Sequence, residues 1–308
     1  MHDVIIIGSG PAGLTASIYT TRANLKTLIL AGSKWGGQLQ LTSLVENYPG
    51  FPEGIQGPDL MTAMRKQAEN VGAEIVDRDF VSGDFTKKGG PFTIKTADQE
   101  YQAKAVIIAT GADTKWLGVP GEEERIGHGV SSCAPCDAPF FRNKNVIVVG
   151  GGDSAMEEAL VLSNFAASVT LVHRSEAFKA SEIMLKRAQK NPKIKFLMDS
   201  EIKEILGEEN VEKVKLHNNK TNEESEMAID GIFVAIGHIP NSKVFEGIDR
   251  DPRGFITVHD HYRTNVEGVF VAGDVHDAEY KQAVTAAGFG CAAALEAEKW
   301  LRDIPELV

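Results

Sequence analysis

The feature that most constrains this chain is a unit of strand, glycine turn, helix and strand near its start. Its parts are an apolar run at 4–7, the turn GSGPAG at 8–13, a helical stretch to about 22 and an apolar run at 27–30. In a dinucleotide-binding unit the first glycine permits the tight turn, the second lets the backbone approach a pyrophosphate, and the third lets helix and strand pack closely. Gly8, Gly10 and Gly13 have that spacing. The turn therefore predicts a dinucleotide site whose phosphates face free N–H groups of the helix.

The same unit recurs in the middle of the chain. Its parts are an apolar run at 145–149, the turn GGGDSA at 150–155, a helical stretch to about 165 and a strand at 168–172. Ala155 stands where the third glycine would be, which the fingerprint allows. Both units also close alike, with a strand (105–109 and 231–235) that ends shortly before Gly111 or Gly237. Two turns in the same context predict an α/β chain with two doubly wound dinucleotide-binding units.

Two dinucleotide sites in one chain suggest two cofactors, and electron transfer from a nicotinamide to a flavin is the usual reason for such a pair. The alternative is a duplication in which one copy no longer binds, but both glycine sets are intact. At 308 residues the chain is long enough for about two domains. The remaining segment, 242–308, is too short for a comfortable third domain, so we expect it to pack against one of the two units.

This last segment contains a strand at 268–272, the pair Gly273-Asp274, and a helical stretch from about 281 to 301 that is rich in alanine and glycine. Small residues let such a helix approach a neighbouring helix or a flat ligand closely. Cys291 lies in this stretch, and we expect it to be a buried, unreactive thiol.

Composition excludes several partners. The formal net charge of −11 argues against nucleic acid and against anionic membranes, because both require a basic surface. No apolar run approaches the ~20 residues that span a bilayer, and the first residues have no basic, signal-like character, so we expect no membrane span and no signal peptide. Three cysteines in 308 residues cannot form a disulfide framework, which favours a cytoplasmic, reducing location.

The residues that select a nicotinamide cofactor differ between the two units. A simple NAD site carries an acid about 20 positions past the glycines, but residues 30–32 of the first unit contain none. In the second unit the corresponding strand end carries His173, Arg174 and Lys179, which favour the 2′-phosphate of NADPH. Glu176 is the counter-argument, because an acid there suits the free 2′-hydroxyl of NADH. A solvated basic turn is a third interpretation, so NADPH ranks above NADH without excluding it.

Cys133 and Cys136 form a CxxC motif shortly before the second glycine turn. This spacing lets one thiol resolve a mixed disulfide formed by the other, and such pairs often have a lowered thiol pKa. Asp137 follows directly and is a candidate for carrying a proton to a leaving thiolate. Half of a zinc site is the alternative, but no histidine lies at ligand spacing, so we expect no metal. Beside two dinucleotide units, a redox role is the better interpretation.

Further segments match the pattern of a known family. They are GGQL at 36–39, VENYPG at 45–50, IATGA at 108–112, CAPCD at 133–137, GHIPN at 237–241, AGDV at 272–275 and YKQA at 280–283. With these segments and the two glycine turns, the chain resembles, from end to end, the low-molecular-weight, bacterial-type thioredoxin reductases, class II of the pyridine nucleotide-disulfide oxidoreductases.

The resemblance implies two Rossmann-like, three-layer ββα dinucleotide-binding domains, the second inserted in the first. The FAD-binding domain would comprise residues 1–113 and 242–308, and the NADPH-binding domain that carries the CxxC would comprise residues 114–241. It also implies a homodimer.

A role for each site residue follows from the same resemblance. The FAD-binding residues would be Gly8, Ser9, Gly10, Pro11, Ala12, Gly13, Gly37, Gln38, Asn47, Thr110, Gly111, Gly273, Asp274, Lys281, Gln282 and Ala283. The NADPH-binding residues would be Gly152, Asp153, Ser154, Ala155, His173, Arg174 and Lys179. Cys133, Cys136 and Asp137 would be catalytic, while Phe140 and Phe141 would offer part of the surface that docks thioredoxin.

The chain departs from the family pattern at a few positions. The family usually has two adjacent arginines where this chain has Arg174-Ser175, and an arginine where it has Lys179, which loosens paired contacts with a 2′-phosphate. Ala138-Pro139 stand where a glycine and an aromatic residue are common, beside the cysteine pair. Lys281 replaces a usual arginine beside the flavin.

The implied function is a flavoprotein disulfide reductase that passes electrons from NADPH through FAD and the Cys133–Cys136 disulfide to thioredoxin or a thioredoxin-like protein, with Asp137 as acid and base. One alternative keeps the fold but serves a different protein disulfide, such as a glutaredoxin-like domain or a peroxidase-reducing module. Another takes electrons from NADH, ferredoxin or reduced flavin. A nucleotide-sensing protein with vestigial sites is a third alternative, which the intact CxxC and its aspartate disfavour.

Overall fold

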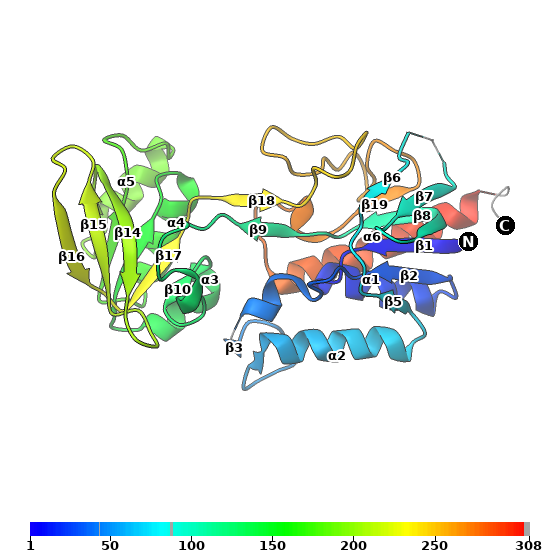
Figure 1. The fold of residues 1–308 in the computed structure, drawn as a ribbon, viewed down its shortest axis with the longest axis horizontal. Coiled ribbons are helices and arrows are strands. Elements are labelled where there is room, and N and C mark those ends of the chain that lie inside the picture. The colour runs from blue at the N-terminus through cyan, green and yellow to red at the C-terminus, as the bar shows by residue number, and fades with distance from the viewer. Residues whose placement is uncertain (43, 87–88, 305–308) are drawn as a thin grey trace. The chain divides into compact units, whose positions relative to one another are not determined.

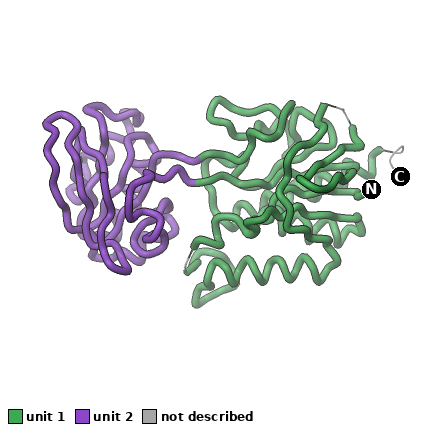
Figure 2. Tube along the Cα trace, in the orientation of Figure 1, with its two compact units in different colours: residues 1–113, 239–308 green, residues 114–238 purple. Residues whose placement is uncertain are grey.

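The computed structural model describes residues 1–42, 44–86 and 89–304, and the chain divides into two compact units (Figure 2). Unit 1 comprises Met1–Asp113 and Ile239–Val308, and unit 2 comprises Thr114–His238. The last segment of the chain therefore belongs with the first, while the middle of the chain forms a unit of its own.

Within the described residues, a seven-stranded sheet forms the centre of unit 1 (Figure 1). Its strands are β1 (His2–Ile7), β2 (Thr27–Leu30), β5 (Glu74–Val76), β6 (Ser82–Gly83), β7 (Phe92–Lys95), β8 (Glu100–Ile108) and β19 (Val269–Val271). Their spatial order is β5-β2-β1-β8-β7-β6, and β19 pairs with β8. Neighbours among β5, β2, β1, β8 and β19 are parallel, whereas β7 is antiparallel to β8. β8 starts before the strand expected at 105–109 because its first half pairs with β7.

One face of this sheet is covered by the helices α1 (Pro11–Arg22), α2 (Gly57–Asn70) and α6 (Ala283–Asp303). Because side chains alternate along a strand, Ile6 and Ile29 pack among these helices, while Ile5 and Leu28 pack on the opposite face. The predicted strand at 27–30 and the predicted helix end at 22 are both confirmed.

α6, from the end of the chain, packs closely on α1. An added Cβ on Gly290 would overlap the carbonyl oxygen of Ala12, so the small residues of this helix permit the close approach. The expectation that the tail packs against one of the two glycine-turn units is confirmed for unit 1.

Unit 2 repeats the arrangement around a parallel sheet of order β10-β17-β11-β12-β13. These strands are β10 (Val130–Ser131), β11 (Asn145–Val149), β12 (Ser168–Val172), β13 (Ile194–Leu197) and β17 (Gly231–Val234). The helices α3 (Ala134–Asp137), α4 (Asp153–Ser163) and α5 (Glu182–Lys190) accompany them. An antiparallel sheet is formed by β14 (Ser200–Leu206), β15 (Lys213–Asn218) and β16 (Glu224–Ala228).

The central sheet of unit 2 has a different partner on each face. Val146 and Val148 pack in the cluster that contains the helices, whereas Ile147 and Val149 pack in the cluster that contains the antiparallel sheet. Helices, parallel sheet and antiparallel sheet thus form three layers, and the predicted α/β fold with Rossmann-like units is confirmed.

Two short ladders complete the described structure. β3 (Leu44–Val45) pairs with β4 (Ile55–Gln56), and β9 (Ala112–Thr114) pairs with β18 (His238–Pro240), where the chain leaves and re-enters unit 1. Over the described parts of the chain, no helix has both the length and the apolar character needed to cross a membrane.

Candidate active site

A cavity of about 570 Å³ lies in unit 1, at the carboxyl ends of its parallel strands. Doubly wound sheets bind their ligands at this edge, where the loops after neighbouring strands meet. The lining residues run across the sheet, from Asp79 after β5 and Gly32 after β2, through the turn after β1, to Thr110 after β8 and Asp274 after β19. Of the residues expected to bind FAD, all except Gly13 and Asn47 line this cavity.

The turn after β1 shows why its glycines are needed. Gly8 has a φ of +111°, and an added Cβ would overlap the carbonyl oxygen of Ala109. By contrast, an added Cβ on Gly10 would meet no atom within 4 Å, so the backbone at Gly10 is open to a ligand. α1 begins at Pro11 without a side-chain cap, which leaves the N–H groups of its first turn without intrahelical partners. This arrangement fits a pyrophosphate.

Asp274 supplies a second sign that the cavity receives a ligand. Its Oδ1 is buried and has no hydrogen-bond partner among the described residues. Burial raises the pKa of this carboxyl to about 6, Asp277 adds to the rise, and Lys281 opposes it. A buried acceptor without a donor is costly, so a ligand that brings a hydroxyl group would satisfy it. The polyhydroxyl chain of a flavin nucleotide has that chemistry.

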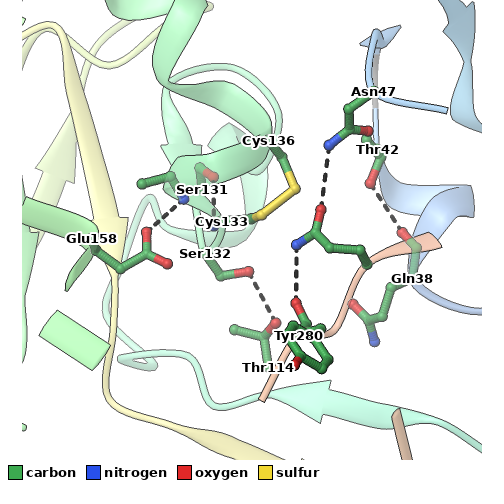
Figure 3. The surroundings of a disulfide bond; sticks show 12 residues. Gln38, Thr42, Asn47, Thr114, Ser131, Ser132, Cys133, Cys136, Glu158 and Tyr280 are labelled. Carbon is green, nitrogen blue, oxygen red and sulfur yellow. Dashed lines mark hydrogen bonds between the residues drawn. A yellow bond between two sulfur atoms is a disulfide. The ribbon is translucent and has the colours of Figure 1, made fainter. Parts of the chain in front are cut away.

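Asn47 does not line the cavity, but it contacts Gln282, which does. Its Nδ2 donates a hydrogen bond to Oε1 of Gln282 at 3.3 Å (Figure 3). Gln282 is the N-cap of α6 and shares a capping box with Thr285. The preceding Lys281 has a φ of +48°, and its backbone N–H donates to Asp277 Oδ2 at 2.9 Å. Side-chain contacts therefore hold the start of α6 at the wall of the cavity.

The glycine turn of unit 2 has the same construction. An added Cβ on Gly150 would overlap the carbonyl oxygen of Ala235, whereas an added Cβ on Gly152 would meet no atom within 4 Å. α4 begins directly after Gly152 at Asp153, whose Oδ1 accepts a hydrogen bond from Ser181 N at 2.6 Å. Gly152 and the first turn of α4 therefore present an open backbone to a second anionic ligand.

The segment 173–180 lies against this turn. The backbone N–H groups of Lys179 and Ala180 both donate to the carbonyl oxygen of Gly151, at 2.8 and 3.1 Å. The ring of His173 stacks on Phe178, with centroids 5.0 Å apart. The side chains of Arg174 and Lys179 are exposed, and neither forms an ion pair with a described residue. Two cations next to a phosphate-binding turn are suited to an additional phosphate.

The acidic residue of this segment has a partner. Glu176 Oε2 lies 3.8 Å from Lys220 Nζ, and both side chains are strongly exposed. This pairing reduces the weight of Glu176 as a competitor for a ribose hydroxyl, although a surface pair of this kind is weak.

Cys133 and Cys136 are joined in a disulfide at the start of α3 in unit 2 (Figure 3). The backbone N–H of Cys133 donates to Ser131 Oγ at 3.0 Å. The next N–H, that of Ala134, donates to Oε2 of Glu158 on α4 at 2.5 Å. Pro135 has no N–H to donate. The backbone around the pair is therefore held by the two preceding N–H groups, one bound to a hydroxyl and the other to a carboxylate.

Asp137 follows the disulfide and is largely buried. Burial raises the pKa of its carboxyl, and a hydrogen bond with Ser131 opposes the rise. A carboxyl with a raised pKa keeps its proton to higher pH, which is the property required of a proton donor to a thiolate.

Two expectations are wrong. Phe141 does not offer a docking surface, because it is buried at 7% exposure and its ring packs edge-on against Phe233, with centroids 5.1 Å apart. Its neighbour Phe140 is 38% exposed. Cys291 is only partly buried, and a hydrogen bond with it raises the pKa of the Tyr19 hydroxyl.

The residues that the structure brings to these sites and that sequence reasoning missed include Asp79, Asn241 and Glu158. Asp79 and Asn241 line the cavity of unit 1, and Glu158 holds the cysteine turn in unit 2. A signal existed for two of them: Asn241 ends the segment 237–241 that matches the family pattern, and Asp79 follows a strand, where residues after parallel strands gather at one edge of a sheet. Nothing in the sequence around Glu158 distinguishes it from the exposed Glu157.

Comparison with known proteins agrees with this geometry. The family described as "Pyridine nucleotide-disulphide oxidoreductase" matches residues 2–290. A protein of Mycolicibacterium smegmatis named "Thioredoxin reductase" is 52% identical over 306 residues, covering 98% of this chain and 97% of its own. One of the same name from Streptomyces coelicolor is 50% identical over 309 residues, covering 99% and 96%.

Solved structures are similar as well. The "Thioredoxin reductase from Giardia duodenalis" has 42% identity and a TM-score of 0.92, covering 98% of this chain and 99% of its own. The thioredoxin reductase of Streptococcus pyogenes has 40% identity and a TM-score of 0.93, covering 99% of both chains.

Proposed function

Since the chain belongs to the pyridine nucleotide-disulphide oxidoreductase family, and within it to the thioredoxin reductases, we propose that it uses NADPH and FAD to reduce thioredoxin through the Cys133–Cys136 disulfide. The disulfide is the observation that carries this proposal, because it lies in the same compact unit as a complete nucleotide turn. Family membership implies a flavin and a pyridine nucleotide, and FAD and NADPH are the specific cofactors we propose.

The cavity of unit 1 supports FAD. When bound, the flavin supplies a carrier of two electrons between a nicotinamide and a disulfide. Gly10 and the start of α1 would hold the pyrophosphate, and Asp274 would accept a hydrogen bond from the ribityl chain. Gln282 and the N-terminus of α6 would lie at the flavin edge, where a helix dipole stabilises negative charge.

The turn of unit 2 supports NADPH over NADH. Gly152 and the first turn of α4 would hold its pyrophosphate. Arg174 and Lys179 have no competing ion pair in the described structure, so both are available for a 2′-phosphate. With one arginine and one lysine in place of a family arginine cluster, the contact would be less strongly bidentate.

The disulfide exchange is done by the chain's own groups. After reduction, one thiolate of the pair would attack the disulfide of thioredoxin and form a mixed disulfide, which the second cysteine would resolve. Asp137, with its raised pKa, would give a proton to the leaving thiolate and take it back in the next cycle.

Anaerobic titration of the purified enzyme with NADPH and, separately, with NADH tests the proposal. We expect the flavin absorbance to bleach with up to two equivalents of NADPH, because the flavin and the Cys133–Cys136 disulfide each accept two electrons, and to respond to NADH only at much higher concentration. Addition of oxidised thioredoxin should then restore the absorbance. A protein that binds no flavin, or that bleaches without transferring electrons to thioredoxin, would contradict the proposal.

Two further proposals rest on the resemblance and the composition. We infer a homodimer, which sedimentation of the purified protein would test. We also infer a cytoplasmic location, supported by the low cysteine content. A different protein-disulfide partner is the alternative function, and it is less favoured because the similar proteins named above are thioredoxin reductases.

A further inference from the structure

The first glycine-turn unit lacks a residue that dinucleotide sites normally have. Strand β2 ends at Leu30, and Ala31-Gly32 follow where an acid would bind the ribose next to the adenine. A hydroxyl pair at that place would have no acceptor from its own unit's second strand. The structure offers an acceptor from the neighbouring strand instead.

Strand β5 brings Asp79 to the end of β2. The two strands are parallel, with Leu30 opposite Val76, so their carboxyl ends lie at the same edge. Three successive hydrogen bonds join the segments that follow: Ala31 N to Val76 O at 2.8 Å, Gly32 N to Arg78 O at 3.2 Å, and Ser33 N to Asp79 Oδ1 at 2.8 Å. The carboxylate of Asp79 is therefore held against the loop that lacks an acid.

Gly32 leaves room for this carboxylate. An added Cβ on Gly32, which has a φ of +83°, would lie 3.3 Å from Asp79 Oδ1. Asp79 lines the cavity together with Gly32 and Lys34, and it forms no ion pair with a described residue. Its Oδ1 is occupied by Ser33, and its second oxygen is available to a ligand in the cavity.

The position along the cavity identifies which part of a dinucleotide would lie there. The pyrophosphate turn after β1 is in the middle of the strand order, β2 and β5 lie to one side, and β8 and β19 lie to the other. Asp274 and the start of α6 are on the β19 side. In dinucleotide-binding units the ribose of the adenosine lies at the end of the second strand, which here is the side of Asp79.

We propose that Asp79 recognises the adenosine ribose of the FAD, accepting a hydrogen bond from a ribose hydroxyl in place of the missing acid after β2. This inference rests on the proposed FAD site and names a residue that selects its ligand. Lys34 lines the same end of the cavity, and it would suit a phosphate on that ribose rather than a hydroxyl. Asp79 therefore favours a free hydroxyl on the adenosine ribose, whereas Lys34 would favour a phosphate there.

The test measures binding of FAD to flavin-free protein, so it does not depend on turnover. Three ligands are titrated by flavin fluorescence: FAD, and two FAD analogues whose adenosine ribose lacks the 2′- or the 3′-hydroxyl. The variants are D79A and D79N, and the second of these keeps an oxygen that can accept a hydrogen bond from Ser33. D77N is the matched control, because Asp77 is an exposed acid on the same segment that pairs with Arg65.

We expect D79A to raise the Kd for FAD by about ten- to a hundredfold, the usual loss for a hydrogen bond to a charged group. One deoxy analogue should bind wild type with a similar loss, and D79A should add nothing further to it. D79N should lie between wild type and D79A, whereas D77N should bind FAD like wild type.

Two results would overturn the assignment of Asp79 alone. One is an unchanged Kd in D79A, and the other is an equal loss for FAD and both analogues, which would mean that Asp79 only shapes the loop through Ser33. Tighter binding of FAD by D79A would likewise contradict a hydrogen bond from the ribose to this carboxylate. Wild-type protein that binds no FAD would overturn the proposed function as well.

Discussion

The carboxylate of Glu158 accepts a hydrogen bond from the backbone N–H of Ala134, at 2.5 Å, and so ties the helix that follows the nucleotide turn to the residue after Cys133. This N–H is the first of α3, has no acceptor within the helix and lies next to the disulfide. A charged acceptor at a partly buried helix start contributes more than a neutral surface contact.

The first prediction follows from that bond. Changing Glu158 to Ala should lower the free energy of unfolding by about 1–2 kcal/mol and slow thioredoxin reduction, because the cysteine turn loses its anchor. Glu158→Gln, which retains an acceptor, should recover most of the rate. Thermal unfolding and steady-state assays measure both effects. Glu157→Ala, at the exposed neighbour, is the control, and equal effects of the two alanine variants would show that the anchor is unimportant.

The cysteine pair gives the second prediction. Cys133→Ser and Cys136→Ser should each reduce thioredoxin no faster than the uncatalysed reaction, since either change removes the disulfide. Both variants should still bleach their flavin with NADPH in a stopped-flow measurement. Cys291→Ser, at the free cysteine, should behave like wild type. A wild-type rate in either of the first two variants would end the assignment of the redox pair.

The third prediction concerns pH and Asp137. Burial raises the pKa of this carboxyl, so its protonated fraction is lost as the pH rises through that raised value. As a proton donor it should make the rate of disulfide exchange fall on the alkaline side. Asp137→Asn should slow exchange by about 10²- to 10⁴-fold and remove this part of the pH profile. An unaltered profile in the variant would assign the titration to another group.

Asp274 leads to a prediction about stability. Its folded-state pKa of about 6 exceeds the ordinary 3.8, so the folded protein binds the proton more tightly than the unfolded chain does. The free energy of unfolding of flavin-free protein therefore falls as the pH rises from about 4 to about 6. Above pH 6 the charged Asp274 lowers it by about 3 kcal/mol.

Changing Asp274 to Asn should remove this cost. Flavin-free Asp274→Asn protein should melt at a higher temperature than flavin-free wild type at pH 8, with a smaller difference at pH 5. The same change should weaken FAD binding, because the amide is a poorer acceptor for a ligand hydroxyl. Thermal melts across pH and fluorescence titration measure the two effects. A melting difference that is constant across pH would contradict the role of the charge.

The last prediction addresses the nicotinamide cofactor. Arg174→Ala and Lys179→Ala should each raise the KM for NADPH by about tenfold or more, because each removes a charged contact with the 2′-phosphate. The KM for NADH should change little. Lys203→Ala is the control, at an exposed lysine of β14 that pairs with Glu201. Parallel losses for NADPH and NADH would instead place both residues at a part that the two cofactors share.

Local pattern was sufficient for much of the fold. The strands at 27–30, 145–149 and 168–172 lie at the positions predicted, because each is a short apolar run next to the glycine turn or the helix of its unit. The Cys133–Cys136 pair was also visible, since four residues of sequence bring the two thiols together. The roles of the cofactor-binding residues stay predictions.

What the sequence by itself determined is the two nucleotide turns and the redox pair, since each depends on residues within one short segment. What only the tertiary structure decided is how distant segments share one edge or one core. Pairing of β2 with β5 brought Asp79 to the end of β2, and α4 brought Glu158 to the cysteine turn. Contact with Phe233 buried Phe141, although its neighbour Phe140 remains exposed. These outcomes depend on packing between residues far apart in the chain. Short-range sequence patterns do not predict such contacts.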